Sequence, residues 1–198
     1  LEGDITLAQN LNTTSTSVNA IILNAGKNTA AGTITGGDIL VSGTPTITMG
    51  TGGIAKLYSG SVSGSTGLTD FVGIGSGRFR YNSDEATTNF TKVLGAGVNA
   101  IYREGSSLSG ILSTENMVYG DALPNFSGGL GLVNGDSWAD LTIVSATYST
   151  TNQLKAGSYS VNASGLSTLG YNVSSITAGS LTVSAKGLNI QGFSPNNK

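Results

Sequence analysis

The chain has 198 residues, and only 10% of them are charged while 38% are hydrophobic, which is too little charge for a disordered polyelectrolyte. Thirty glycines and a scarcity of helix formers such as Glu, Lys and Arg predict an all-β protein rather than one with long exposed helices. The net charge of −2 includes no cluster of Lys and Arg, which argues against nucleic acid as a partner. No apolar run approaches the roughly 20 residues of a membrane-spanning helix, so we expect no membrane insertion.

Two residue types that carry much of enzyme chemistry are missing, because the chain contains no Cys and no His. The absence of Cys excludes disulfides, thiolate catalysis and Cys-ligated metals, and the absence of His removes the commonest general base. The few acids are scattered, whereas a lyase or glycosidase built on a β-helix needs convergent carboxylates. We therefore expect a protein that is not an enzyme and uses neither a cofactor nor a metal.

The first part of the chain contains short apolar clusters separated by Gly, Asn, Thr and Asp. These clusters lie at residues 5–7, 21–23, 39–41 and 54–57, about 15 to 18 residues apart. Such a period predicts the rungs of a parallel β-solenoid with Gly or Asn at the corners, and we assign residues 1–85 to it. An antiparallel sandwich is the alternative. Asp4 and Asp38 follow glycines in matching positions, where we expect them to stack on one edge and bind backbone N–H groups.

Residues 86–114 are predicted to be a cap or linker that ends the solenoid. All three arginines of the chain lie in or just before this segment, beside two tyrosines. One interpretation is structural, in which the arginines form cross-strand ion pairs with Asp84 and Glu85. The other is a glycan-binding groove, in which aromatic faces stack on sugar rings and guanidinium groups bind acidic polysaccharides. The residues of this possible groove are Arg78, Arg80, Tyr81, Tyr102 and Arg103.

Residues 115–186 have a different texture, with apolar side chains alternating along several segments. Leu181, Val183 and Ala185 are expected to face one way, as are Leu141 and Ile143. Because parallel strands would need crossover helices that this composition does not favour, we predict an antiparallel module, either a small sandwich or a β-grasp-like sheet. Residues 187–198 are assigned to the start of a next repeat or to a tail.

Five sequence blocks in this second half resemble the MBG-type repeat domains of large bacterial surface proteins. They begin with VYGDALP at residues 118–124 and GLVNGD at 131–136, followed by AGSYSV at 156–161, GYNV at 170–173 and GSLTV at 179–183. The blocks occur in the order of that family. Within them, Asp121 and Asp136 are expected to be turn residues rather than catalysts, and Trp138 to be a core anchor.

The first half resembles the end of the right-handed parallel β-helix of two-partner-secretion exoproteins of the filamentous-haemagglutinin type. The stretch that carries this resemblance is IAKLYSGSVSGSTGLTDFVGIGSGRFRYNSDE, at residues 54–85. The two resemblances together imply a secreted, cell-surface or biofilm-matrix adhesin, in which the solenoid is a shaft and the MBG-type module an extension. They also imply an outer-membrane secretion partner and a host-cell or matrix receptor that is a glycan or a protein. A lectin-like module or a polysaccharide-active β-helix protein is the competing function.

Overall fold

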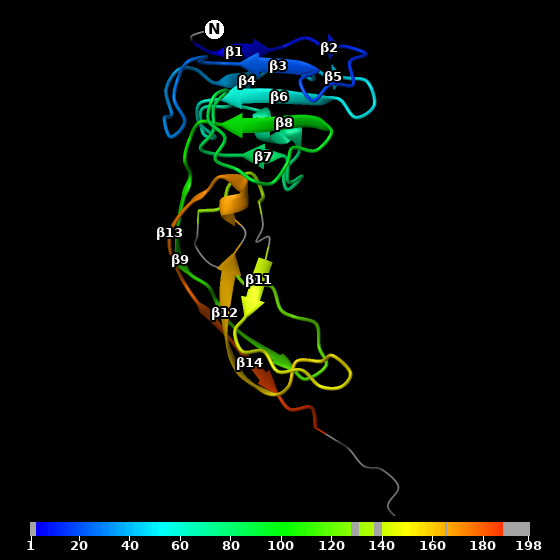
Figure 1. The fold of residues 1–198 in the computed structure, drawn as a ribbon, viewed down its shortest axis with the longest axis vertical. Coiled ribbons are helices and arrows are strands. Elements are labelled where there is room, and N and C mark those ends of the chain that lie inside the picture. Colours follow the sequence, from blue (N-terminus) through cyan, green and yellow to red (C-terminus); the bar gives the residue numbers. More distant parts are fainter. Residues whose placement is uncertain (1–2, 128–130, 137–139, 165, 188–198) are drawn as a thin grey trace, which may run out of the picture. The chain divides into compact units, whose positions relative to one another are not determined.

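The computed structural model describes residues 3–127, 131–136, 140–164 and 166–187, and strands dominate it (Figure 1). Its helical elements are the short helix α1 (Leu68–Val72) and a 3₁₀ turn (Leu166–Leu169). The prediction of an all-β protein is therefore confirmed. The chain divides into two compact units. Unit 1 comprises Leu1–Gly110, Leu130–Asp140 and Ser164–Ile176, and unit 2 comprises Ile111–Gly129, Leu141–Ala163 and Thr177–Lys198.

Unit 1 contains three sets of parallel strands. The strands are β1 (Ile5–Leu7), β2 (Leu11–Asn12), β3 (Ile21–Asn24), β4 (Ile39–Val41), β5 (Ile47–Thr48), β6 (Ile54–Ser59), β7 (Phe79–Arg80) and β8 (Gly97–Tyr102). β1 pairs with β4, β2 with β5, and β3, β6, β8 and β7 form one four-stranded sheet in that order. Two further strands, β9 (Ser107–Ile111) and β13 (Asn172–Thr177), form a separate pair.

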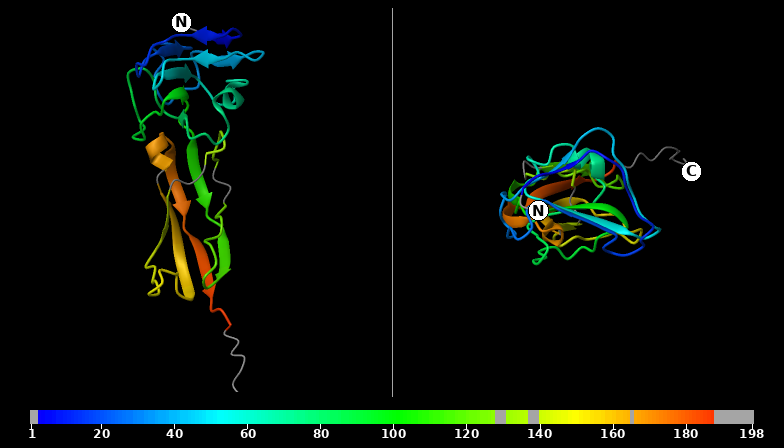
Figure 2. Two further views of the ribbon diagram at one scale, coloured as in Figure 1. Left: turned by 90° about the vertical axis from the view of Figure 1, so that its right-hand side faces the viewer. Right: turned by 90° about the horizontal axis from the view of Figure 1, so that it is seen from above.

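The paired strands show that the chain returns over itself after about 35 residues. Ile5 lies opposite Ile39, Leu11 opposite Ile47 and Ile21 opposite Ala55. The blue and cyan segments accordingly follow similar paths in the view from above (Figure 2). We call the stretch of about 35 residues between one strand and its partner a coil. The predicted interval of 15 to 18 residues is wrong as a stacking period, because two consecutive apolar clusters, such as residues 5–7 and 21–23, are different strands of the same coil. Every second cluster stacks instead.

The next return is longer, since Ile54 of β6 lies opposite Gly97 of β8. The additional residues form α1 and β7, and Phe79 of β7 pairs with Ala100 on the other edge of β8. β8 lies inside the segment predicted as a cap or linker, and here its six residues extend the sheet of unit 1.

The two Gly-Asp steps lie on top of one another. A Cβ atom on Gly37 would stand 2.3 Å from the backbone of Gly3, and Gly37 has a φ of +123°. Asp4 Oδ1 accepts the backbone N–H of Asp38 at 2.8 Å. These contacts confirm that the two aspartates stack and that Asp4 binds a backbone N–H.

The core of unit 1 is built around a row of aromatic rings. Tyr102 stacks between Phe79 and Tyr81, with ring centroids 6.5 and 5.8 Å away, and Tyr171 lies against Tyr81 at 4.2 Å. Leu57 and Ala100 are completely buried in the same cluster. Most of these side chains come from β6, β7, β8 and the residues beside them, whereas Tyr171 comes from the segment just before β13, so the core of unit 1 also uses a late part of the chain.

Unit 2 contains one mixed sheet in the order β10, β14, β12, β11. The strands are β10 (Thr114–Val118), β14 (Gly179–Ser184), β12 (Gly157–Ser164) and β11 (Asp140–Ile143). β12 and β14 are antiparallel as predicted, but β10 and β14 are parallel. The prediction of a fully antiparallel module is therefore wrong. About 60 residues connect β10 to β14, and a connection of that length can return the chain to a parallel strand without a crossover helix.

The alternation predicted for β14 is largely confirmed. Leu181 and Val183 are buried, but Ala185 follows the strand and is exposed. The side chain of Leu141 and all of Trp138 lie outside the described residues.

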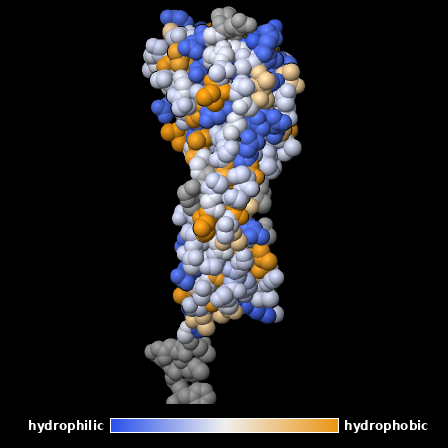
Figure 3. Space-filling view, turned by 90° about the vertical axis from the view of Figure 1, so that its left-hand side faces the viewer, coloured by the Kyte–Doolittle hydropathy of each residue, from blue (hydrophilic) through white to orange (hydrophobic). Residues whose placement is uncertain are grey.

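The surface carries scattered apolar side chains. On the face drawn in Figure 3 they form small groups among polar residues. Among the large hydrophobic residues that the structure describes, Val93 is the most exposed, at 83%. In the part of the chain that the structure describes, no helix has the length and apolar character to cross a membrane.

Candidate functional site

The residues of the possible glycan groove lie mostly in the interior of unit 1. Arg80, Tyr81, Tyr102 and Arg103 are at most 1% exposed, and burial raises the pKa of Tyr102 to about 12. Arg78 is half-buried, and its guanidinium donates to the carbonyl of Ala96. The predicted arrangement, with ring faces and guanidinium groups open to a sugar, is therefore wrong for four of the five residues. Their aromatic and apolar surfaces are used in the core.

Arg80 holds a loop against the end of β7. Its Nε and Nη2 donate to the carbonyls of Lys92 and Val93 at 2.9 and 2.8 Å, and its Nη1 donates to those of Gly77 and Phe79. The guanidinium also lies 5.6 Å from the ring centre of Phe90. Burial lowers the pKa of Arg80, although the nearby carboxylate of Asp136 opposes this change. With most of its donors on backbone carbonyls, Arg80 is a structural anchor.

Arg103 plays a similar part beneath the turn that connects β3 to β4. Its Nη2 donates to the carbonyls of Gly37 and Thr35 at 2.7 and 3.2 Å, and its own carbonyl accepts the N–H of Gly32 at 2.7 Å. Gly26 passes so close that a Cβ atom there would stand 2.8 Å from Nη2. Burial lowers the pKa of Arg103, against the attraction of Asp38 and two other acids. A buried cation here links the turn before β4 to the end of β8 through backbone carbonyls.

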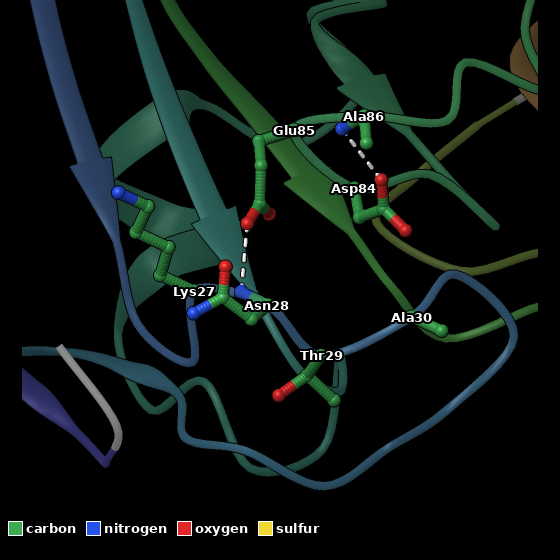
Figure 4. Close-up of a pocket in the computed structure, with 7 residues that line it drawn as sticks. All are labelled: Lys27, Asn28, Thr29, Ala30, Asp84, Glu85 and Ala86. Carbon is green, nitrogen blue, oxygen red and sulfur yellow. Dashed lines mark hydrogen bonds between the residues drawn. The ribbon is translucent and has the colours of Figure 1, made fainter.

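Asp84 and Glu85 border a polar hollow of about 330 Å³ in unit 1 (Figure 4). The residues around it are Lys27, Asn28, Thr29, Ala30, Asp84, Glu85 and Ala86. Glu85 accepts the N–H of Asn28 at 2.7 Å and the side-chain amide of Asn24 at 3.0 Å. Asp84 accepts the backbone N–H groups of Ala31, Ala86 and Thr87 at 2.5–2.7 Å.

Electrostatics at this hollow follow from those bonds. Burial raises the pKa of each carboxyl, but the N–H donors outweigh it, and the pKa values of Asp84 and Glu85 are both lowered. The predicted structural role of these acids is therefore correct, but their partners are backbone N–H groups rather than the expected arginines. Asp84 and Glu85 thus connect the turn after β3 to the segment after β7 by hydrogen bonds.

Sequence reasoning missed a shared carboxylate in unit 1. Asp136 Oδ2 accepts the hydroxyl protons of Tyr81 at 2.6 Å and of Tyr171 at 2.9 Å, and the amide of Asn134 donates to the Tyr81 oxygen at 3.0 Å. Burial raises the pKa of Asp136, and the pKa values of both tyrosines are raised as well, burial being the largest cause.

The turn predicted at this position is present, with positive φ at Asn134 and Gly135. The Asn-Gly-Asp step was the available signal, because it marks a tight turn that projects an acid. Nothing in the sequence placed that acid beside tyrosines 35 and 55 residues away.

The carboxylates of Asp84, Glu85 and Asp136 accept hydrogen bonds from backbone and side-chain groups of the chain itself. Asp38 likewise accepts the N–H of Ser61 at 2.7 Å and lies 3.4 Å from the hydroxyls of Ser59 and Ser65. Among the described residues, no group of three or more acids could hold a metal ion.

Comparison with known protein families gives a match for one part of the chain, residues 111–182. Residues 111–182 match the family model of the MBG domain (YGX type), so the resemblance seen in the five sequence blocks is confirmed for this region. The match begins near the predicted start at residue 115 and includes the Tyr119-Gly120-Asp121 step. No curated protein and no solved structure matches the chain. Residues 111–182 are thus similar to the MBG domain (YGX type), a surface-associated repeat module of larger proteins that is found in bacterial surface and adhesin-like proteins.

Proposed function

We propose that the chain is a structural segment of a large secreted bacterial surface or biofilm-matrix adhesin. In this role, unit 1 is the end of a right-handed parallel β-helix that serves as a shaft, and the MBG-type domain is a modular spacer. Adhesion is multivalent and carried mainly by other parts of the full-length protein.

The observation that carries the proposal is the stacking of parallel strands in unit 1. Three successive strands of the first coil each lie beside a strand about 35 residues later. Stacked coils of this kind add length with each repeat, since each contacts only its neighbours. Such a geometry supports a rod and its extension better than it supports a substrate pocket.

The MBG-type match supports the remaining parts of the proposal. Because these domains occur in extracellular and surface proteins, we infer that the full-length protein is exported to the cell surface. Two-partner secretion through an outer-membrane protein and a glycan or protein receptor on host cells or matrix belong to the same proposal. So does the absence of enzymatic activity, which rests on the missing His and Cys and the occupied carboxylates.

The test is a replacement in the organism that encodes the full-length protein. In-frame deletion of residues 1–187 should reduce attachment to the natural surface, because the binding region is then displayed nearer to the cell. Inserting an unrelated rigid domain of similar length should restore attachment if the segment is a spacer. Attachment that stays lost after this insertion would show that the segment itself binds the receptor, and attachment unaffected by the deletion would exclude both roles.

A further inference from the structure

The turn at Asn134 and Gly135 in unit 1 contains the only Asn-Gly step in the sequence. In such a step the backbone nitrogen of the glycine can attack the side-chain carbonyl carbon of the asparagine, because glycine has no side chain to hinder the approach. The new C–N bond closes a succinimide ring, and the amide nitrogen leaves as ammonia after taking up the proton of the glycine N–H. Water then opens the ring at either carbonyl carbon and leaves an aspartate or an isoaspartate.

The folded chain holds the side chain of Asn134 at both ends. Its Oδ1 accepts the hydroxyl proton of Thr69 in α1 at 2.6 Å, and its Nδ2 donates to the hydroxyl oxygen of Tyr81 at 3.0 Å. The residue is only 8% exposed. Ring closure moves the carboxamide carbon onto the nitrogen of Gly135 and expels Nδ2, so both hydrogen bonds must break first. The closed turn therefore opposes the reaction.

The backbone of the turn is held as well. Asn134 and Gly135 have φ values of +55° and +71°, and the carbonyl of Asn134 accepts the N–H of Gly75 at 2.9 Å. A Cβ atom on Gly135 would stand 2.5 Å from Cγ2 of Ile74. This packing leaves little space for a succinimide ring, or for the additional backbone carbon that an isoaspartate inserts at this position.

An acid at position 134 does not fit the bonds that the amide makes. A tyrosine hydroxyl has a single proton, and Tyr81 donates its own to Asp136 at 2.6 Å. The Tyr81 oxygen can therefore only accept from residue 134, which an amide group allows and a carboxylate does not. A carboxylate there would also lie near that of Asp136, and two like charges in one site destabilise the folded state.

We propose that Asn134 is a modification site protected by the closed turn, which deamidates when this part of unit 1 opens and whose acidic product hinders closure. Local opening of a folded domain is by itself reversible. The Asn-Gly step converts an opening that lasts long enough for ring formation into a permanent chemical change of the chain. This inference does not depend on the proposed role in an adhesin.

Mass spectrometry of the peptide that contains residue 134 measures the conversion of amide to acid in the full chain, with and without urea. When opening and closing are fast compared with the reaction, its rate follows the fraction of open molecules, so conversion should be at least about tenfold slower in the folded chain. Thr69→Val removes the donor to Oδ1 and should raise the rate in the folded chain but not in urea. Thr66→Val, at an exposed residue just before α1, is the matched control and should change neither rate.

The effect on closure is measured with Asn134→Asp, which has the side chain of one product. Its urea midpoint should fall, whereas Asn152→Asp, at an exposed residue that also has a positive φ, should leave the midpoint in place. Equal conversion rates with and without urea would overturn the proposed protection, as would a folded-state rate that Thr69→Val does not raise. An unchanged midpoint for Asn134→Asp would overturn the proposed effect of the product on closure.

Discussion

Asp136 is half-buried, with two tyrosine hydroxyls on one of its oxygens, and this arrangement determines how the residue responds to substitution and to pH. Burial raises its pKa in the folded chain. A raised pKa means that the contribution to stability is present at low pH and is lost as the pH rises through the folded value. At neutral pH the negative charge is therefore a cost, which the hydroxyl bonds offset.

We predict that Asp136→Asn and Asp136→Ala differ strongly at pH 7. Asparagine keeps an oxygen that accepts from Tyr81 and Tyr171 and removes the charge from this half-buried site, so the free energy of unfolding should change by less than about 1 kcal/mol. Alanine leaves both hydroxyls without their acceptor, at about 1–3 kcal/mol each. Urea unfolding followed by circular dichroism measures both values. Equal stability of the alanine variant and the unmodified chain would contradict this account.

Asp84 is expected to show the opposite pH response. Its pKa is lowered by three backbone N–H donors despite burial, so its contribution is present above the unfolded pKa of about 4 and is lost as the pH falls through the folded value. We predict that Asp84→Asn lowers the free energy of unfolding by about 1–3 kcal/mol at pH 7, because an amide group faces some of those donors.

The difference between the Asp84→Asn chain and the unmodified chain should shrink as the pH falls from 5 to 3, as measured by urea unfolding at each pH. Asp70→Asn changes an exposed aspartate on α1 and is the control. A difference that is independent of pH would show that the N–H bonds to Asp84 do not depend on its charge.

At the scale of elements, the close approach of Gly37 to Gly3 tests whether the first two coils stack as described. A methyl group on Gly37 meets the backbone of Gly3 at 2.3 Å, and positive φ adds a conformational cost of about 1–2 kcal/mol. We predict that Gly37→Ala destabilises the chain by at least about 2 kcal/mol. Gly95→Ala is the matched control, since nothing lies within 4 Å of its Cβ position. Similar thermal midpoints for the two variants would contradict the stacking.

Sequence reasoning succeeded for elements whose signals are local. The Gly-Asp steps at Asp4 and Asp38 predicted a stacked edge, and the alternation of Leu181 and Val183 predicted a half-buried strand. It failed for the stacking period, because apolar clusters at 5–7 and 21–23 look alike although they lie on different strands of a coil. Periodicity reports which residues are buried, and only the pairing shows which ones are neighbours.

The same limit explains the errors at the predicted groove. Arginine next to tyrosine is a pattern shared by sugar-binding surfaces and by cores in which guanidinium groups bind carbonyls. Arg80 and Arg103 reach carbonyls of Val93 and Gly37, and these contacts depend on how the segments between β-strands fold back. The Asp136 cluster was missed for the same reason, since its two tyrosine partners come from segments 55 and 35 residues away.

At the scale of the whole molecule, unit 1 depends on segments that come late in the chain. The N–H of Tyr81 donates to the carbonyl of Leu169 at 2.9 Å, and Gly170 is packed so closely that a Cβ atom would stand 2.1 Å from the Tyr81 carbonyl oxygen. The predicted boundary near residue 115 would cut these partners away. A fragment of unit 1 that ends there lacks part of its own core.

We therefore predict that a chain of residues 1–110 does not unfold cooperatively, whereas a chain of residues 1–187 does. Loss of Tyr171 and Asp136 uncovers the aromatic row at Tyr81, so tyrosine fluorescence should become accessible to acrylamide in the shorter chain. Urea titration and fluorescence quenching measure the two effects. A cooperative transition of unchanged midpoint in residues 1–110 would show that the later segments add nothing to unit 1.

The parallel pairing of β10 and β14 has a mechanical consequence for unit 2. The chain enters β10 at Thr114 and leaves β14 at Ser184, and these residues lie at opposite ends of one registered pair. Tension applied at the two points slides the strands past each other, so the bonds across all five residue pairs resist together rather than opening one after another. If the proposed role as a spacer holds, this registered pair is the part of unit 2 that carries the pulling force.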